Sequence, residues 1–207
     1  MDMCCRYCLD KTSDELDDII ATAASSKTAD KFSRMCLPMI TSGEIKPTNV
    51  APVIAPAPSG RPAVFAMRWG YNIPGKANPI LNARVETAKI RPTFKDDWAK
   101  HRCVVPASYY YEWEHLTDPA GRTKTGSKYL IQPKGASVTW LCGLYRIEDG
   151  LPYFVILTRE PSDSVIHIHD RMPLMLPKDK IAQWTNPDGM PDWLISYALT
   201  EMVAEKF

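Results

Sequence analysis

The strongest constraint on the fold is a succession of short strand-like segments in the middle of the chain. These segments are rich in β-branched and aromatic residues, and turn signals such as Asp149-Gly150 separate them. They cover residues 63–69, 102–105, 108–113, 128–132, 137–145 and 153–158. Few of them alternate with helices, so βαβ units are not the organising pattern. The sequence predicts an α+β fold with a mostly antiparallel sheet or an open β-barrel and flanking helices.

Helical periodicity is found mainly near the two ends. Thr12 and Glu15 form a capping box before apolar residues at helical spacing, which predicts an amphipathic helix over residues 13–24. The other predicted helices cover residues 28–35, 94–101, 178–184 and 192–205. Residues 172–176 predict a late strand.

Proline and turn residues mark the irregular parts. Residues 47–62 are rich in proline and alanine, which predicts an edge strand or an ordered loop. Residues 116–126 and 186–191 are the best linker candidates. We see no internal repeat and no low-complexity tail, so the 207 residues are expected to form one domain, 1–207.

Charge and cysteine content narrow the class of protein. The formal net charge of +1 does not indicate a nucleic-acid binder, although a local basic groove remains compatible with it. Six cysteines, three of them crowded near the N-terminus, make a poor disulfide framework. No signal peptide and no apolar run of membrane-spanning length is found, which predicts a cytoplasmic protein without a membrane partner.

Cys4 is the most reactive candidate. A cysteine at the very start of a chain offers a thiol and an α-amine together, and this pair can condense with an aldehyde to a thiazolidine ring. The thiolate is the nucleophile, and nearby cations favour it; Arg6 is the nearest one in the sequence. A competing interpretation is a zinc site, because Cys5-x-x-Cys8 has ligand spacing and His167-x-His169 would complete the set.

Three further motifs carry polar side chains in apolar surroundings. In a strand, Asn82, Arg84 and Glu86 would share one face, either as an exposed face with an Arg84–Glu86 contact or as a donor beside a phosphate clamp. Glu112 lies in an aromatic segment. It either points to solvent or is buried, where its pKa would rise and make it a proton carrier.

His169 and Trp69 also have two interpretations each. His169 precedes Asp170 and Arg171 in a stiff turn; it would titrate near neutral pH as a general acid or base, or it is structural. Trp69, before Gly70, would offer an aromatic surface to bases or pack in the core.

Taken together, these motifs resemble the SOS response-associated peptidase (SRAP) family, whose members shield abasic sites in single-stranded DNA. Seven motifs match in order over nearly the whole chain. They are Met3-Cys4-Cys5-Arg6-Tyr7, Asn49-Val50-Ala51-Pro52, Trp69-Gly70, Asn82-Ala83-Arg84-Val85-Glu86-Thr87, Cys103-Val104-Val105-Pro106-Ala107 with Tyr111-Glu112-Trp113, Ile156-Leu157-Thr158, and His169-Asp170-Arg171-Met172-Pro173.

The resemblance implies a covalent reaction with DNA. Cys4, Asn82, Glu112 and His169 would be catalytic, and Arg6, Trp69 and Arg84 would contact single-stranded DNA. Cys4 would form a thiazolidine cross-link with the aldehyde of an abasic site, protecting it during the DNA damage response. The implied protein needs no metal and no cofactor, is a monomer, and associates with the nucleoid when bound to DNA.

Two departures from the family pattern concern the N-terminus. Cys5 stands where the family has glycine, and Met1-Asp2-Met3 precedes Cys4. Cys4 becomes terminal only if translation starts at Met3 or if the leader is removed. The alternatives are therefore a cysteine-type (auto)peptidase that removes its own leader, and a non-covalent zinc- or DNA-binding module.

Overall fold

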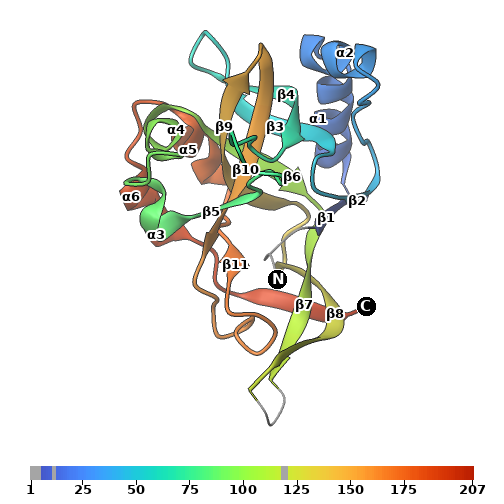
Figure 1. Ribbon diagram of the computed structural model, residues 1–207, viewed down its shortest axis with the longest axis vertical. Coiled ribbons are helices and arrows are strands. Elements are labelled where there is room, and N and C mark those ends of the chain that lie inside the picture. Colours follow the sequence, from blue (N-terminus) through green and yellow to red (C-terminus); the bar gives the residue numbers. More distant parts are fainter. Residues whose placement is uncertain (1–5, 11–12, 118–120) are drawn as a thin grey trace.

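A computed structural model describes residues 6–10, 13–117 and 121–207 of the chain. Figure 1 shows helices α1 and α2 at one end and the β7–β8 hairpin at the other. The helices are α1 (Asp14–Ala24), α2 (Lys27–Arg34), α3 (Val85–Ala88), α4 (Lys95–Lys100), α5 (Ile181–Thr185) and α6 (Pro191–Leu194), with 3₁₀ turns η1 (Lys178–Lys180) and η2 (Ile195–Tyr197). The strands are β1 (Arg6–Leu9), β2 (Gly43–Ile45), β3 (Val50–Pro56), β4 (Pro62–Trp69), β5 (Asn82–Arg84), β6 (Arg102–Ala107), β7 (Tyr109–Thr117), β8 (Thr123–Pro133), β9 (Thr139–Glu148), β10 (Leu151–Arg159), β11 (Met172–Pro173) and β12 (Met202–Lys206).

The strands described form two sheets. One, here called the open sheet, is antiparallel with the order β12-β8-β7-β1-β2. In the other, β10, β4, β3, β6 and β9 follow one another and β9 pairs again with β10, which closes a barrel. The short strands β5 and β11 pair with β10 outside this ring. The predicted α+β class with a mostly antiparallel sheet, a barrel and flanking helices is confirmed.

Aromatic packing fills the barrel. The Trp69 ring stacks on Phe154, with centroids 6.0 Å apart, and lies 5.3 Å from the Tyr7 ring. All three side chains are fully buried. Because Tyr7 belongs to β1 of the open sheet, this cluster also joins the two sheets.

Several elements match their predicted limits, and one cap differs. Helix α1 begins as expected, but Ser13 caps it: the Ser13 hydroxyl accepts a hydrogen bond from the Leu16 amide at 3.3 Å. Thr12, the predicted cap, lies outside the described residues. Helices α2, α4 and α5 and strand β11 lie where the sequence predicts them.

Several predictions about local structure are wrong. The stretch 47–62 contains β3, which is buried between β4 and β6 because barrel closure leaves it no free edge. Residues 116–117 and 123–126 do not belong to a linker, because they form the paired ends of β7 and β8. The predicted helix 192–205 forms only short turns and then β12, because its backbone pairs with β8.

Residues 186–191 are also no linker, because a buried arginine holds this loop. Arg102, 1% exposed, donates to the carbonyl oxygens of Trp184 and Trp98 at 2.8 and 2.6 Å and to that of Asn186 in the loop. Burial lowers the pKa of this guanidinium.

None of the helices among the described residues is long and apolar enough to cross a membrane.

Candidate functional site

The centre of the site is a buried carboxylate beside a buried imidazole. Glu112 lies on β7 and His169 in the loop between β10 and β11; they are 4% and 3% exposed. His169 Nε2 lies 3.9 Å from Glu112 Oε1, and the same oxygen accepts the Trp113 amide at 3.2 Å. Of the two interpretations left open for Glu112, burial is confirmed.

A backbone contact sets the tautomer of His169. The Arg171 amide donates to Nδ1 at 3.0 Å, so Nδ1 is an acceptor and the proton of the neutral ring is on Nε2, the nitrogen nearer Glu112. Asp170 Oδ1 also lies 2.9 Å from Nδ1. That carboxylate is 81% exposed and well hydrated, so the buried amide is the stronger determinant.

The environment of His169 favours its neutral form. Burial, and then the Coulombic effect of His115, lower the pKa of His169 to about 4. The prediction that His169 titrates near neutral pH is therefore wrong. At pH 7 its ring is uncharged and offers Nε2–H as a hydrogen-bond donor.

Arg171 connects this loop to the barrel. Its guanidinium donates to Glu86 Oε1 and Oε2 at 2.7 and 2.8 Å and to the Thr158 carbonyl on β10 at 2.8 Å. Partial burial would raise the pKa of Glu86, but the hydrogen bonds and charge of Arg171, together with backbone hydrogen bonds, outweigh burial and lower that pKa. The Glu86 carboxylate thus pairs with Arg171 across two motifs, a partner that the sequence analysis did not consider.

Strand β5 places Asn82 and Arg84 beside β10. Asn82 pairs with Ile156 and Arg84 with Thr158, in parallel register. Ala83 between them is buried, so the alternation puts Asn82 and Arg84 on the opposite face, where Arg84 is exposed. The strand ends at Arg84, so Glu86 lies on α3 and not on this face.

Arg6 lies at the start of β1, opposite Tyr111 of β7. Its Nη1 is 3.2 Å from Glu44 Oε1, and Lys128 Nζ is 3.6 Å from the same oxygen. The Lys128 ammonium lies 3.6 Å from the centre of the Tyr111 ring. Two cations thus share one carboxylate next to the strand that carries Glu112.

The structure contradicts the expected base-stacking role of Trp69. Its ring is fully buried in the barrel, and its Nε1 donates to the Leu81 carbonyl at 3.0 Å. The alternative interpretation, core packing, describes this residue.

Cys4 lies outside the described residues, as does Cys5 of the zinc interpretation. Cys8 is buried and donates to Asp10 Oδ1 at 3.3 Å, and burial is the main cause that raises the pKa of its thiol. Among the described residues, one group of three potential metal ligands occurs, His115, His169 and Asp170, with donor atoms within 4.8 Å of one another. His169 Nδ1 already accepts the Arg171 amide, so this nitrogen is not available to an ion.

His115 is a residue of the site that the sequence analysis missed. Its ring centroid lies 3.9 Å from that of His169, and its amide donates to the Ile168 carbonyl at 2.9 Å. No local signal marks it, because His115 and Glu112 are three residues apart and a regular strand would put them on opposite faces.

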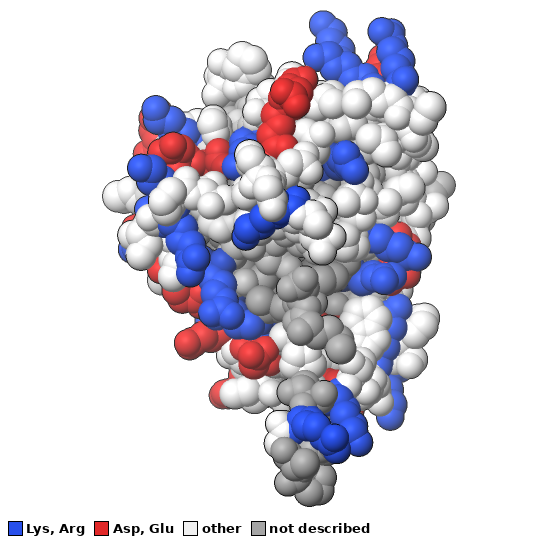
Figure 2. Space-filling model, in the orientation of Figure 1, with Lys and Arg blue, Asp and Glu red and all other residues white. Residues whose placement is uncertain are grey.

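Basic side chains lie on the face of the molecule that Figure 2 shows. Figure 2 shows lysine and arginine on both sides of its centre and at the lower tip, where the β7–β8 hairpin lies. A local basic surface therefore exists despite the small net charge.

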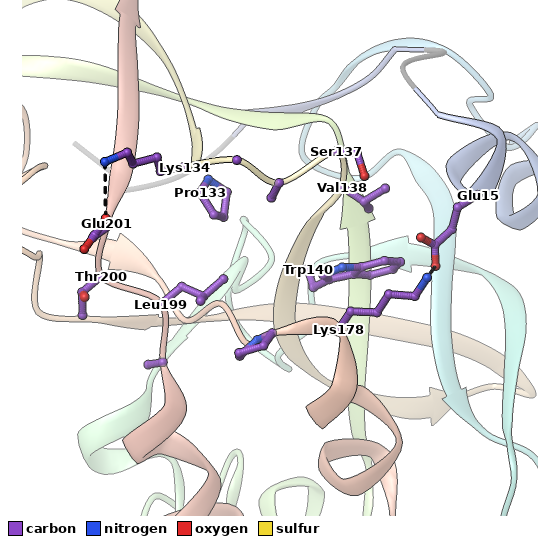
Figure 3. Close-up of a pocket in the computed structure, with 14 residues that line it drawn as sticks. Glu15, Pro133, Lys134, Ser137, Val138, Trp140, Lys178, Leu199, Thr200 and Glu201 are labelled. Atoms are coloured by element: carbon purple, nitrogen blue, oxygen red, sulfur yellow. Dashed lines mark ion pairs between the residues drawn. The ribbon is translucent and has the colours of Figure 1, made fainter.

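A cavity of about 600 Å³ lies elsewhere, beside Trp140 and Leu199. Figure 3 shows ion pairs at its rim: Lys178–Glu15 at 2.7 Å and Lys134–Glu201 at 3.7 Å. The described residues that line it include none of the predicted site residues. The predicted reactive groups Glu112 and His169 therefore lie outside the lining of this cavity.

Comparison with solved structures supports the fold. The chain is similar to a protein from Bacteroides thetaiotaomicron, with a TM-score of 0.71 and 20% identity over 99% of this chain and 92% of that one. It is also similar to a phage-related protein from Bordetella bronchiseptica, with a TM-score of 0.70 and 19% identity over 99% and 94%. At this identity the likeness concerns the fold alone.

Sequence comparison identifies the family. Abasic site processing protein YoaM of Bacillus subtilis is 33% identical over 76% of this chain and 74% of its own length. Abasic site processing protein YoqW of the same organism is 32% identical over 94% and 85%. The family model for SOS response associated peptidase (SRAP) matches residues 3–206. The chain that holds Glu112 against His169 therefore belongs to the SRAP family.

Proposed function

We propose that this protein binds single-stranded DNA and joins Cys4 to the aldehyde of an abasic site through a thiazolidine ring. The observation that carries the proposal is the buried Glu112–His169 pair beside the start of β1. Arg6 lies opposite Tyr111, the neighbour of Glu112, and two peptide units limit the Cys4–Arg6 Cα distance to about 7 Å. Curated relatives are named for abasic site processing, which supplies the substrate class.

The proposed reaction proceeds in two bond-forming steps. The Cys4 amine attacks the open-chain sugar aldehyde and water leaves, which gives an imine. The thiolate then adds to the imine carbon and the imine nitrogen takes up a proton, so the net loss is one water. Glu112 would carry protons between the amine and the departing oxygen.

His169 would act as a neutral donor in this scheme. Its Nε2–H would hydrogen-bond to the sugar oxygen and favour opening of the sugar ring. The imidazole of His169 would stay uncharged throughout. Asn82 would orient the Cys4 amine or a sugar oxygen. This assignment replaces the proton transfer expected from a histidine that titrates near pH 7.

Arg84 and Arg6 would contact phosphates on the basic face. Arg84 is exposed beside Asn82, and Arg6 lies next to Lys128. Each phosphate contact removed should lower the slope of log K against log[salt] by about one and weaken binding to all sequences alike. A protein of this function would work in the cytoplasm, at the nucleoid.

The adduct itself is the test. The protein is incubated with an abasic single-stranded oligonucleotide, heated and analysed by mass spectrometry. The expected product has the mass of the chain from Cys4 onward plus the DNA minus one water. Cys4→Ala should lose it, whereas Cys36→Ala, a change at an exposed cysteine just after α2, should keep it. A heat-stable adduct in Cys4→Ala would refute Cys4 as the nucleophile, and salt-sensitive binding without adduct would favour a binding module.

Self-cleavage is the second candidate, and the three residues before Cys4 favour it. Thiazolidine formation needs a free Cys4 amine, so whatever precedes Cys4 must be removed. If the site does this itself, intact mass should show wild type starting at Cys4 and Glu112→Gln retaining Met1-Asp2-Met3. Equal processing in both would assign the cleavage to another agent.

A further inference from the structure

His115 contacts His169 at an irregularity in the pairing of β7 with β8. The pairing register of β7 with β8 shifts between Trp113, opposite Lys128, and His115, opposite Thr125. Two residues of β8 thus face one residue of β7, which is a β-bulge and increases the local twist. Both Glu112 and His115 contact His169, although regular alternation would separate them. Two side chains of β7 thus reach the same imidazole at the point where its pairing with β8 is irregular.

The backbone at this point also holds the loop of His169. The His115 amide donates to the Ile168 carbonyl at 2.9 Å, directly before His169 in the chain. The His169 amide in turn donates to the Val165 carbonyl at 3.1 Å, which closes a turn of the loop. His115 thus contacts His169 through its ring and Ile168, the residue before His169, through its backbone amide.

We infer that His115 is a positioning residue for His169, which packs against the imidazole and keeps it uncharged with Nε2–H directed toward Glu112. The inference rests on the proposed function for its catalytic consequence. The contact itself does not depend on that function.

The surroundings of His169 make its charge state sensitive to this neighbour. Among the described residues, its ring faces Glu112 at Nε2, Asp170 at Nδ1 and the His115 ring on one side. The Arg171 guanidinium is engaged by Glu86 and the Thr158 carbonyl instead. Within that described set, His115 is therefore the second imidazole in contact with His169, and a charge on one ring disfavours charge on the other. The pKa of His169, lowered by burial and then by His115, agrees with this.

Removing His115 should have two separable effects. Without the Coulombic effect of His115, His169 should bind a proton at higher pH, since burial is then the main effect that opposes it. Without the ring contact, the imidazole should lose its orientation, and a misplaced catalytic group slows a reaction by about tenfold or more. DNA affinity should stay unchanged, because the substitution leaves the proposed phosphate contacts Arg6 and Arg84 in place.

Nuclear magnetic resonance of the four histidines tests the charge effect without any substrate. In His115→Gln the titration midpoint of His169 should move upward from the wild-type value. His167→Gln is the matched control, because His167 lies in the same loop and is exposed, and it should leave that midpoint unchanged. An unchanged midpoint in His115→Gln overturns the inference.

Rates of adduct formation test the positioning effect. His115→Gln should slow cross-linking by roughly tenfold at saturating DNA, while His115→Phe, which keeps a ring against His169, should restore most of the rate. Equal rates in wild type and His115→Gln overturn the inference. If wild type forms no adduct at all, the proposed function fails, while the titration still decides the His115–His169 coupling.

Discussion

Glu86→Gln is the sharpest test of how the site is held together. In the wild type, two charge-assisted hydrogen bonds of 2.7 and 2.8 Å join Arg171 to Glu86, with side chains 10% and 41% exposed. Glutamine retains one acceptor oxygen and presents an NH₂ group to the guanidinium. One charged hydrogen bond is worth about 1.5–3 kcal/mol when buried. Discounted for the exposure of Glu86, the loss should be about 1–2 kcal/mol.

Urea unfolding at pH 7 measures this loss, and a thermal scan should show a melting temperature lower by about 2–8 °C. Glu201→Gln is the control. Its carboxylate is 80% exposed and lies 3.7 Å from Lys134, so its replacement should change nothing measurable. The same midpoint in both variants would refute the reasoning.

The pH dependence gives a second, independent check. The folded-state pKa of Glu86 lies below its ordinary value of 4.5, despite burial, because Arg171 binds the carboxylate. Its contribution to stability is therefore complete well above pH 4.5 and is lost as the pH falls through the lowered pKa. The gap between wild type and Glu86→Gln should close in that range, since protonated glutamate resembles glutamine. A stability difference between the two proteins that persists at low pH would mean that the charge of Glu86 does not contribute to stability.

Three further changes probe elements described above, each by urea unfolding. Arg102→Leu should cost about 3–5 kcal/mol, because it leaves several buried carbonyl oxygens without a donor; a loss below about 1 kcal/mol would contradict the role of Arg102 in holding the loop. Trp69→Ala should cost about 3–5 kcal/mol through the cavity it opens, and a variant that keeps full stability but loses DNA affinity would restore the stacking role. Ser13→Ala should cost about 1 kcal/mol through loss of the α1 cap, whereas an unchanged stability would show that the cap contributes nothing.

Local pattern was sufficient wherever a segment is stabilised mainly by its own residues or by chain neighbours. Helix α1 follows from its apolar spacing, and β4, β9 and β10 follow from their β-branched and aromatic runs. The failures at residues 202–206 and at β3 share one cause, which is pairing with a distant segment. Residues 202–206 form a strand because β8 offers them an edge, although their local pattern favours a helix. Strand β3 is interior because the barrel closes around it.

Some features of the candidate site could likewise be predicted from the sequence, and others could not. Glu112 and His169 were identified from residue type and motif, and the family resemblance assigned their roles. The sequence could not show that Arg171 binds Glu86, 85 positions away, or that Trp69 is buried. Nor could it show His115 beside His169, because the two residues lie on separate segments and the pairing of β7 with β8 is irregular at His115.

The amino-acid sequence by itself determined the class of fold, the family and the kinds of reactive group available, because these depend on residue type and on local periodicity along the chain. Tertiary structure decided which groups meet and in what charge state. Contacts such as His169 with Glu112 and His115 join separate segments, and burial, which sets the protonation of His169, exists only once the two sheets have packed together.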